Sequence, residues 1–215
     1  CIRDSYCGKE LFEQVENKFI ELGEVVGSEL EELALSADKN PPKLKKRSRV
    51  GELSNDIEKH PDFIKIEKFA FEKFGLAAMS HRHGVFGMQQ PLPPIVKYGL
   101  TFLFVQSEFG LCCPLSMTDS LTRTLTKFGD KKLIEQFFDQ LTSQDLDHLF
   151  QGAMFMTEQH AGSDVGSIDT YAEYVDGNWF LTGDKWFCSN PDADLAMVLA
   201  LSLIHISEPT RRTII

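Results

Sequence analysis

The residues best suited to chemistry lie between Thr157 and Asp164, where short polar and small side chains follow an apolar run. Thr157 and Ser163 carry hydroxyl groups, and Gly162 allows backbone amides to come close to a ligand. Such a turn can donate N–H and hydroxyl hydrogens to a ligand with a row of acceptors, such as a flavin ring or a pyrophosphate. Gly-Ser-Asp is also ordinary turn chemistry, so both a binding loop and a plain surface turn fit these residues.

Short runs of β-forming residues surround this turn and begin at about residue 149. Asp176-Gly177 is a strong signal for a tight hairpin turn between two of them. We predict the following strands: Ala153–Thr157, Thr170–Val175, Trp179–Leu181, Lys185–Ser189 and Leu195–Ala200.

Residues 1–148 have a helical pattern instead. Apolar residues recur every three or four positions, and Ser116 with Asp119 and then Asp130 provide N-cap signals. We expect the helix that opens at His60-Pro61 to bury Phe63, Ile64, Phe69, Phe71 and Phe74. The predicted helices are Leu11–Leu35, the one from Pro61, Pro94–Phe109, Met117–Phe128 and Lys131–Leu141. Helices followed by strands predict an α+β fold with an all-α domain over residues 1–148 and a β domain over residues 149–200.

Residues 36–50 interrupt the helical pattern with Pro41-Pro42 and a basic cluster. We predict a mobile surface loop here, and phosphate or partner binding is the alternative. The basic residues are Lys43, Lys45, Lys46, Arg47 and Arg49.

The composition indicates a globular chain without a membrane span: 42% of its 215 residues are hydrophobic and 25% are charged. A net charge of −10 argues against non-specific binding to nucleic acid or anionic membranes. Five cysteines without a CxxC spacing fit neither a disulfide framework nor a structural zinc site, so we expect the cytoplasm or another reducing compartment. Because the chain does not begin with Met, we expect a truncated N-terminus and leave targeting open.

Two histidines and the C-terminal residues carry further signals. His81 and His83 could ligate a metal, but the sequence places no carboxylate or third histidine beside them, so we expect no metal site. Leu201–Arg211 (LSLIHISEPTR) matches, residue for residue, one translated frame of a transposase adapter used in short-read sequencing. We therefore expect residues 201–215 to be an adapter-derived tail outside the fold.

Residues 152–190 carry two motifs in register: TEQHAGSD at 157–164 and GDKWFCSN at 183–190. Together they resemble the FAD-binding segment of acyl-CoA dehydrogenases: an apolar strand ending in Thr-Glu, then Ala-Gly-Ser-Asp, a hairpin, and Gly-x-Lys-x-Trp-x-Thr-Asn. The resemblance extends over residues 50–200 and includes LCCPLSMT at 111–118. The sequences of the two motifs are most similar to those of the AidB-like branch, whose members bind FAD and are associated with DNA binding and alkylation damage.

The resemblance implies a role for each matched residue. The Met156 backbone and the Thr157 hydroxyl would meet the flavin pyrimidine edge, Ser163 would contact the FAD pyrophosphate or the acyl-CoA substrate, and Ser189 would hydrogen-bond flavin N5. Glu158 is expected to be a structural hydrogen-bonding residue and not the catalytic base. The implied cofactor-binding residues are Met154, Met156, Thr157, Gly162, Ser163, Phe187 and Ser189.

The chain departs from the family pattern at several of these positions. Gln159-His160 replaces Pro-Gly, Phe187 replaces a flavin-shielding Trp, Ser189 replaces Thr, and Pro191 replaces Gly. A flat aromatic ring and a hydroxyl are retained, so flavin binding is still expected. Cys188 should point away from the ligand if its neighbours on a strand face it.

The resemblance also implies an architecture and an activity. Residues 149–200 would be the first strands of a middle β-barrel, and a C-terminal helical bundle with the catalytic Glu would lie beyond this chain. The intact protein would remove two hydrogens from the α,β-positions of an acyl-CoA, act as a homo-oligomer and pass electrons to an unknown acceptor. DNA is a partner only under the AidB-like alternative. The chain alone is expected to be inactive.

Overall fold

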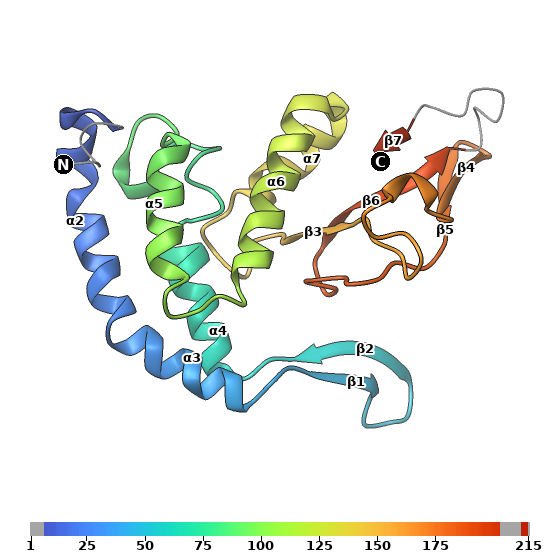
Figure 1. Cartoon of the computed structure of the whole chain (residues 1–215), viewed down its shortest axis with the longest axis horizontal. Coiled ribbons are helices and arrows are strands. Elements are labelled where there is room, and N and C mark those ends of the chain that lie inside the picture. The colour runs from blue at the N-terminus through green and yellow to red at the C-terminus, as the bar shows by residue number, and fades with distance from the viewer. Residues whose placement is uncertain (1–6, 203–211, 215) are drawn as a thin grey trace. The chain divides into compact units, whose positions relative to one another are not determined.

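The computed structural model describes residues 7–202 and 212–214, and the chain divides into two compact units, residues 1–150 and residues 151–215 (Figure 1). Unit 1 contains helices and one two-stranded hairpin, and unit 2 contains a five-stranded sheet with no α-helix among its described residues. The α+β fold predicted from the sequence is thereby confirmed. Within the described ranges, no helix is both long and apolar enough to cross a membrane.

Unit 1 contains six α-helices in its described part. Helix α4 continues directly into a π-helix over Lys68–Lys73, and Val85–Gly87 forms a short 3-10 turn. The α-helices are α2 (Lys9–Val26), α3 (Glu29–Lys39), α4 (Pro61–Glu67), α5 (Pro94–Phe104), α6 (Cys112–Phe128) and α7 (Lys131–Leu141).

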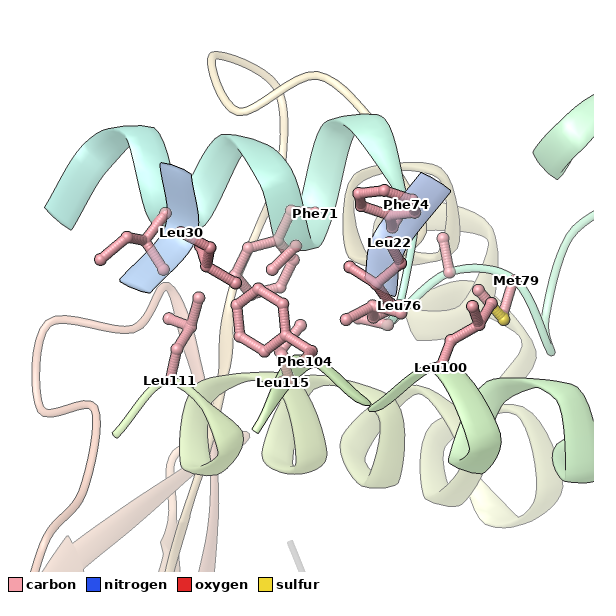
Figure 2. Close-up of a cluster of buried hydrophobic side chains, with 14 of the residues drawn as sticks. Leu22, Leu30, Phe71, Phe74, Leu76, Met79, Leu100, Phe104, Leu111 and Leu115 are labelled. Atoms are coloured by element: carbon pink, nitrogen blue, oxygen red, sulfur yellow. The ribbon is translucent and has the colours of Figure 1, made fainter. Parts of the chain in front are cut away.

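The core of unit 1 is aromatic and aliphatic, with side chains from nearly every helix (Figure 2). Phe71, Phe74 and Phe104 are its largest fully buried side chains. Phe63 and Phe69 are partly buried and pack against this cluster, as expected, but Ile64 is 40% exposed. The predicted burial of Ile64 was wrong because its side chain lies on the solvent side of α4.

Two predicted helices are shorter than their apolar pattern suggested. Leu11–Leu35 is divided into α2 and α3 at Gly27-Ser28, since glycine propagates a helix poorly and Ser28 leaves helical geometry. The predicted helix Pro94–Phe109 ends at Phe104. Beyond that residue Ser107 donates a hydrogen bond to the carbonyl oxygen of Val26 at 2.6 Å, a tertiary contact that takes the chain out of its helical path.

Helix α6 begins at Cys112 and not at Met117, with Pro114 in its first turn, where a missing N–H costs nothing. Ser116 and Asp119 are therefore inside the helix, and the predicted N-cap pair was wrong. The N-cap of α7 is confirmed, because the Asp130 carboxylate accepts a hydrogen bond from the Lys132 amide at 2.8 Å.

Asp119 instead holds a buried ionic cluster. Its Oδ1 lies 2.7 Å from His81 Nε2, and its Oδ2 accepts a hydrogen bond from Lys97 Nζ at 2.6 Å. A carboxylate thus does lie beside His81, contrary to the expectation from sequence, but the Lys97 ammonium shares it and opposes a metal cation there. Burial on its own raises the pKa of Asp119, yet hydrogen bonds from His81 and Lys97 outweigh it and hold that pKa below its ordinary value of 3.8.

This cluster predicts how acid affects unit 1. Because folding depresses the pKa of Asp119, the ionised carboxylate contributes stability above pH 3.8, and that contribution is lost as the pH falls below this value. We expect the urea midpoint, followed by circular dichroism of the helices, to fall less steeply with acid in Asp119→Asn than in the original chain. Asp139→Asn, at an exposed position of α7, should keep the original slope. Equal slopes in the original chain and Asp119→Asn would contradict the prediction.

The basic stretch is not the loop that residues 36–50 were predicted to form. Helix α3 runs to Lys39, and β1 (Lys43–Arg47) pairs antiparallel with β2 (Leu53–Glu58) as a hairpin between α3 and α4 (Figure 1). Across the hairpin, Lys45 Nζ lies 3.0 Å from Glu58 Oε1, so an acidic side chain of β2 partly offsets the basic charge of β1. All of β1 is exposed.

Unit 2 is organised around β6, which pairs parallel with β3 and with β4 and antiparallel with β7. Strands β4 and β5 form the predicted hairpin, in which Asp176 (φ 50°) and Gly177 (φ 84°) both adopt the left-handed region that this tight turn requires. The strands are β3 (Gly152–Phe155), β4 (Tyr171–Val175), β5 (Asn178–Thr182), β6 (Leu195–Ser202) and β7 (Arg212–Ile214).

The adapter origin of residues 201–215 stays a prediction, while the strand predicted over Leu195–Ala200 runs on to Ser202. Leu201 and Ser202 complete β6 and pair with Tyr171 and Ala172 of β4, and the apolar run that starts at Leu195 continues to Leu201. Strand β7 pairs with β6 as well. The remaining tail residues, 203–211 and 215, lie outside the described residues, as does Cys1; Cys7, Cys112, Cys113 and Cys188 are free thiols.

Candidate functional site

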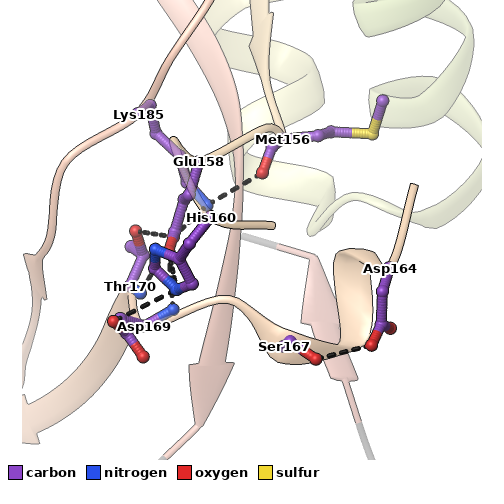
Figure 3. A network of polar contacts seen from close by, with 8 residues as sticks. All are labelled: Met156, Glu158, His160, Asp164, Ser167, Asp169, Thr170 and Lys185. Carbon is purple, nitrogen blue, oxygen red and sulfur yellow. Dashed lines mark hydrogen bonds and ion pairs between the residues drawn. The ribbon is translucent and has the colours of Figure 1, made fainter. Parts of the chain in front are cut away.

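The polar loop that follows β3 is a tight, self-bonded turn. The Glu158 amide donates to the Ala161 carbonyl oxygen at 3.0 Å, and the Ala161 amide donates back to Glu158 at 3.1 Å. After it, the Asp164 carboxylate accepts hydrogen bonds from the Gly166 amide at 3.1 Å and the Ser167 hydroxyl at 2.6 Å (Figure 3). These bonds fix the loop from both ends and leave Gly162 and Ser163 exposed between them.

Glu158 is the buried centre of the site, with 3% of its surface exposed (Figure 3). Its Oε1 accepts hydrogen bonds from the Thr170 amide at 3.0 Å, the Thr170 hydroxyl at 2.5 Å and Lys185 Nζ at 2.9 Å. Its Oε2 accepts from the Asp169 amide at 2.6 Å. The carboxylate therefore joins three segments that are far apart in the sequence.

Burial on its own raises the pKa of Glu158, but hydrogen bonds from Thr170, the Asp169 amide and Lys185 outweigh it and lower the pKa to about 2. A group with so low a pKa is ionised at neutral pH and is a weak proton acceptor. The arrangement agrees with a structural role for Glu158.

His160 lies beside this carboxylate. Its Nε2 is 3.2 Å from Asp169 Oδ2 and 3.8 Å from Glu158 Oε2, so three potential metal-ligand atoms gather within 4.8 Å. The buried member is already engaged, since both Glu158 oxygens accept hydrogen bonds and Lys185 supplies a positive charge. The cluster is therefore best described as a histidine next to a satisfied carboxylate.

Residues 185–189 were predicted to form a strand, and this prediction was wrong. They form a loop of bends, in which Phe187 has φ 56° and Asn190 beyond it also has φ 56°. Gly183 explains the sharp approach to this loop, because a Cβ there would lie 2.3 Å from the Thr170 hydroxyl oxygen. The strand alternation that would have turned Cys188 away from the ligand does not apply.

The predicted site residues lie on two segments of unit 2. Met154 is in β3 and half-buried, Met156 is 45% exposed, and Thr157 is half-buried. Phe187 is 80% exposed and Ser189 is exposed on the second segment. The Trp186 amide donates to the Thr157 carbonyl oxygen at 2.8 Å, which brings the two segments together.

Three residues of the site were not singled out from the sequence: Thr170, Lys185 and Asn190. Thr170 and Lys185 bond Glu158, and the Asn190 amide reaches the Gly152 carbonyl oxygen at 3.2 Å. Lys185 and Asn190 are fixed positions of the Gly-x-Lys-x-Trp-x-Thr-Asn pattern, so the motif could have identified both as site residues.

Comparison with protein families covers nearly the whole chain. The family model for the AidB adaptive-response protein N-terminal domain matches residues 5–148. The model for the acyl-CoA dehydrogenase middle domain matches residues 153–213.

Relatives agree with these matches. Acyl-CoA dehydrogenase family member 11 from Caenorhabditis elegans is 32% identical over 183 residues, which cover 83% of this chain and 29% of that protein. Putative acyl-CoA dehydrogenase AidB from Escherichia coli is 29% identical over 198 residues, which cover 83% of this chain and 34% of that protein. The chain thus spans about a third of the length of these relatives.

Solved structures of acyl-CoA dehydrogenases also resemble this chain. The crystal structure of Caenorhabditis elegans ACDH-11 in complex with C11-CoA matches with a TM-score of 0.73 and 29% identity, over 85% of this chain and 31% of that one. Together with the two family models, this likeness shows that the chain belongs to the acyl-CoA dehydrogenase family of flavoprotein oxidoreductases, with an AidB-type N-terminal domain followed by the family's middle domain.

Proposed function

We propose that this chain forms the flavin-binding side of an FAD-dependent oxidoreductase that introduces an α,β double bond into an acyl-CoA thioester. The observation that carries the proposal is the bond between the Trp186 amide and the Thr157 carbonyl oxygen, which joins the two segments that carry the flavin motifs. Family membership supports the reaction class. The C11-CoA bound to the ACDH-11 relative supports an acyl-CoA substrate.

The surface at these segments suits a flat heteroaromatic ring. Trp186 and Phe187 lie edge to face with ring centroids 6.0 Å apart, and each is at least 49% exposed. Met156 is exposed on the other segment, and Thr157 and Ser189 add hydroxyl groups. Apolar area that is costly to leave in water, next to a few hydrogen-bonding groups, is typical of a cofactor site.

Bound FAD would supply the two-electron acceptor for this reaction. Thr157 would bind the pyrimidine edge, where its hydroxyl can donate a hydrogen bond to a carbonyl oxygen that becomes more negative during reduction. Ser189 would place its hydroxyl at N5. Met154, Met156 and Gly162 would shape the contact surface, and Ser163 would bind the pyrophosphate or the acyl-CoA.

Glu158 is excluded as the base that removes the substrate α-proton. Four hydrogen bonds use its carboxylate oxygens, and a pKa of about 2 makes proton abstraction from carbon unfavourable. The family resemblance implies that the base is a Glu in a C-terminal helical bundle beyond residue 215.

The test begins with the complete open reading frame that contains this chain. The protein expressed from it should purify with bound FAD, and its flavin absorbance should bleach when an acyl-CoA is added without oxygen. The 215-residue chain by itself should neither retain flavin nor oxidise acyl-CoA with a dye acceptor. A colourless complete protein, or one that is not bleached by any acyl-CoA from short to long, would overturn the proposal.

The AidB-type N-terminal domain supports one alternative, a flavoprotein associated with the protection of DNA from alkylation. This alternative expects the complete protein to bind duplex DNA with an affinity that falls steeply with salt, and expects no bleaching by acyl-CoA. The same preparation decides between the two functions.

A further inference from the structure

The loop that carries Phe187 and Ser189 has a backbone that cannot hold its shape unaided. Phe187 and Asn190 both have φ 56°, in the left-handed region that residues other than glycine rarely adopt. Such conformations persist only where surrounding contacts determine them. Within the loop itself, the Ser189 amide bonds the Phe187 carbonyl oxygen at 3.1 Å, which stabilises the turn but does not attach it to the sheet.

Besides the bond from the Trp186 amide to the Thr157 carbonyl oxygen, two side chains attach the loop, and the first of them is Lys185, directly before it. Its ammonium group donates to Glu158 Oε1 at 2.9 Å and to the Met156 carbonyl oxygen at 3.1 Å, and only 7% of its side chain is exposed (Figure 3). Because Glu158 is itself held by Thr170 and Asp169, this attachment point is rigid.

The other attachment is at Asn190, directly after the loop. Its amide nitrogen donates to the Gly152 carbonyl oxygen and to Gln151 Oε1, both at 3.2 Å. Asparagine suits this position, since it tolerates the left-handed region better than most residues while its side chain still reaches a neighbouring strand. Both attachments therefore end on the same stretch of chain, β3 and the residues that flank it.

We propose that Lys185 and Asn190 are positioning residues that tie the Phe187–Ser189 loop to both ends of β3. They thereby set the distance from the Phe187 ring and the Ser189 hydroxyl to Met156 and Thr157. The inference rests on the proposed flavin site, because the distance between the two segments matters only if both contact the flavin. Neither residue touches the cofactor in this proposal. Each acts through the segment that it holds.

Hydrogen exchange on the 215-residue chain tests the attachment without any flavin. Asn190→Gly gives the backbone at 190 an easier left-handed conformation but removes the amide side chain, and Asn190→Asp keeps the shape but removes both donated hydrogens. In each variant the Trp186 and Ser189 amides should exchange at least about tenfold faster, which corresponds to about 1.4 kcal/mol. The β4–β5 hairpin amides should be unchanged.

Asn178→Asp is the matched control. The side-chain amide nitrogen of Asn178 donates to the Asp176 carbonyl oxygen at 3.3 Å, in the same unit but away from the loop. It should leave exchange at Trp186 and Ser189 unchanged. Unchanged loop exchange in Asn190→Gly would overturn the attachment and show that the backbone alone fixes the loop. Equal acceleration across the whole sheet would also overturn it, because Asn190 would then act on overall stability.

The flavin readout is separate. In the complete FAD-binding protein, Asn190→Gly should weaken FAD binding by about tenfold or more, because a site misplaced by about 1 Å loses much of its interaction. A loosened loop with an unchanged Kd for FAD would overturn the positioning role but leave the proposed function standing. A complete protein that binds no FAD would defeat the proposed function, and the exchange result on the chain would still report on the attachment.

Discussion

Lys185→Met is expected to lower the free energy of unfolding of unit 2 by about 3 kcal/mol or more, because it leaves the Glu158 carboxylate buried without its counter-ion. The side chain of Lys185 is 7% exposed and that of Glu158 is 3% exposed. Water therefore cannot solvate the Glu158 carboxylate in place of the lost ammonium group. Both tryptophans of the chain, Trp179 and Trp186, lie in unit 2, so their fluorescence during urea unfolding reports on this unit alone.

A double-mutant cycle separates the ion pair from other effects. Glu158→Gln removes the negative charge, so adding Lys185→Met to it should cost clearly less than Lys185→Met costs in the original chain. Lys9→Met removes a lysine from an exposed pair in unit 1, where Lys9 and Glu13 lie 3.9 Å apart, so its effect is followed by circular dichroism of the helices. It should change the stability of unit 1 by no more than about 0.5 kcal/mol. A loss at Lys185 as small as that at Lys9 would contradict the buried pair.

Phe104→Ala is expected to destabilise unit 1 by about 3 to 5 kcal/mol, since it removes a fully buried aromatic ring and leaves a cavity between helices. Phe104 lies among Leu111, Leu115 and Phe71 in the core (Figure 2). Circular dichroism of the helices during urea or thermal unfolding measures the loss.

The matched control is Phe102→Ala, which makes the same substitution in the same helix at a side chain that is 66% exposed. It should change the stability of unit 1 by no more than about 0.5 kcal/mol. If the two variants unfolded at the same urea concentration, the packing of α5 against the core would have to be reconsidered.

Elements whose signals are local could be predicted from the sequence. Asp130 caps α7 because its carboxylate bonds an amide two residues away, and Asp176-Gly177 turns the β4–β5 hairpin because those two residues alone supply the backbone conformation. Neither depends on a distant partner, so a short window of sequence contains the whole cause.

Elements set by distant partners could not be predicted in this way. Asp119 has the chemistry of a helix cap, but His81 and Lys97, far from it in the chain, use its carboxylate inside α6. The Lys185–Ser189 run is apolar enough for a strand, but Lys185 and Asn190 hold it as a loop against β3.

In the candidate site, too, some features could be predicted from the sequence and others could not. The motifs identified the two segments, because residue types at fixed spacing recur in the family. The contacts that join the segments, Lys185 to Met156 and the Trp186 amide to Thr157, depend on tertiary structure, and no rule of spacing predicts them.

The parallel pairing of β3 with β6 has a consequence for the order in which the chain folds. Gly152 pairs with Leu195 and Phe155 with Val198, so this pairing cannot form until β6 has been synthesised. Contacts between residues so distant in sequence form slowly, whereas helices form from local contacts. During translation unit 1 should therefore fold first, and the pairing of β3 should follow only after β6 has left the ribosome.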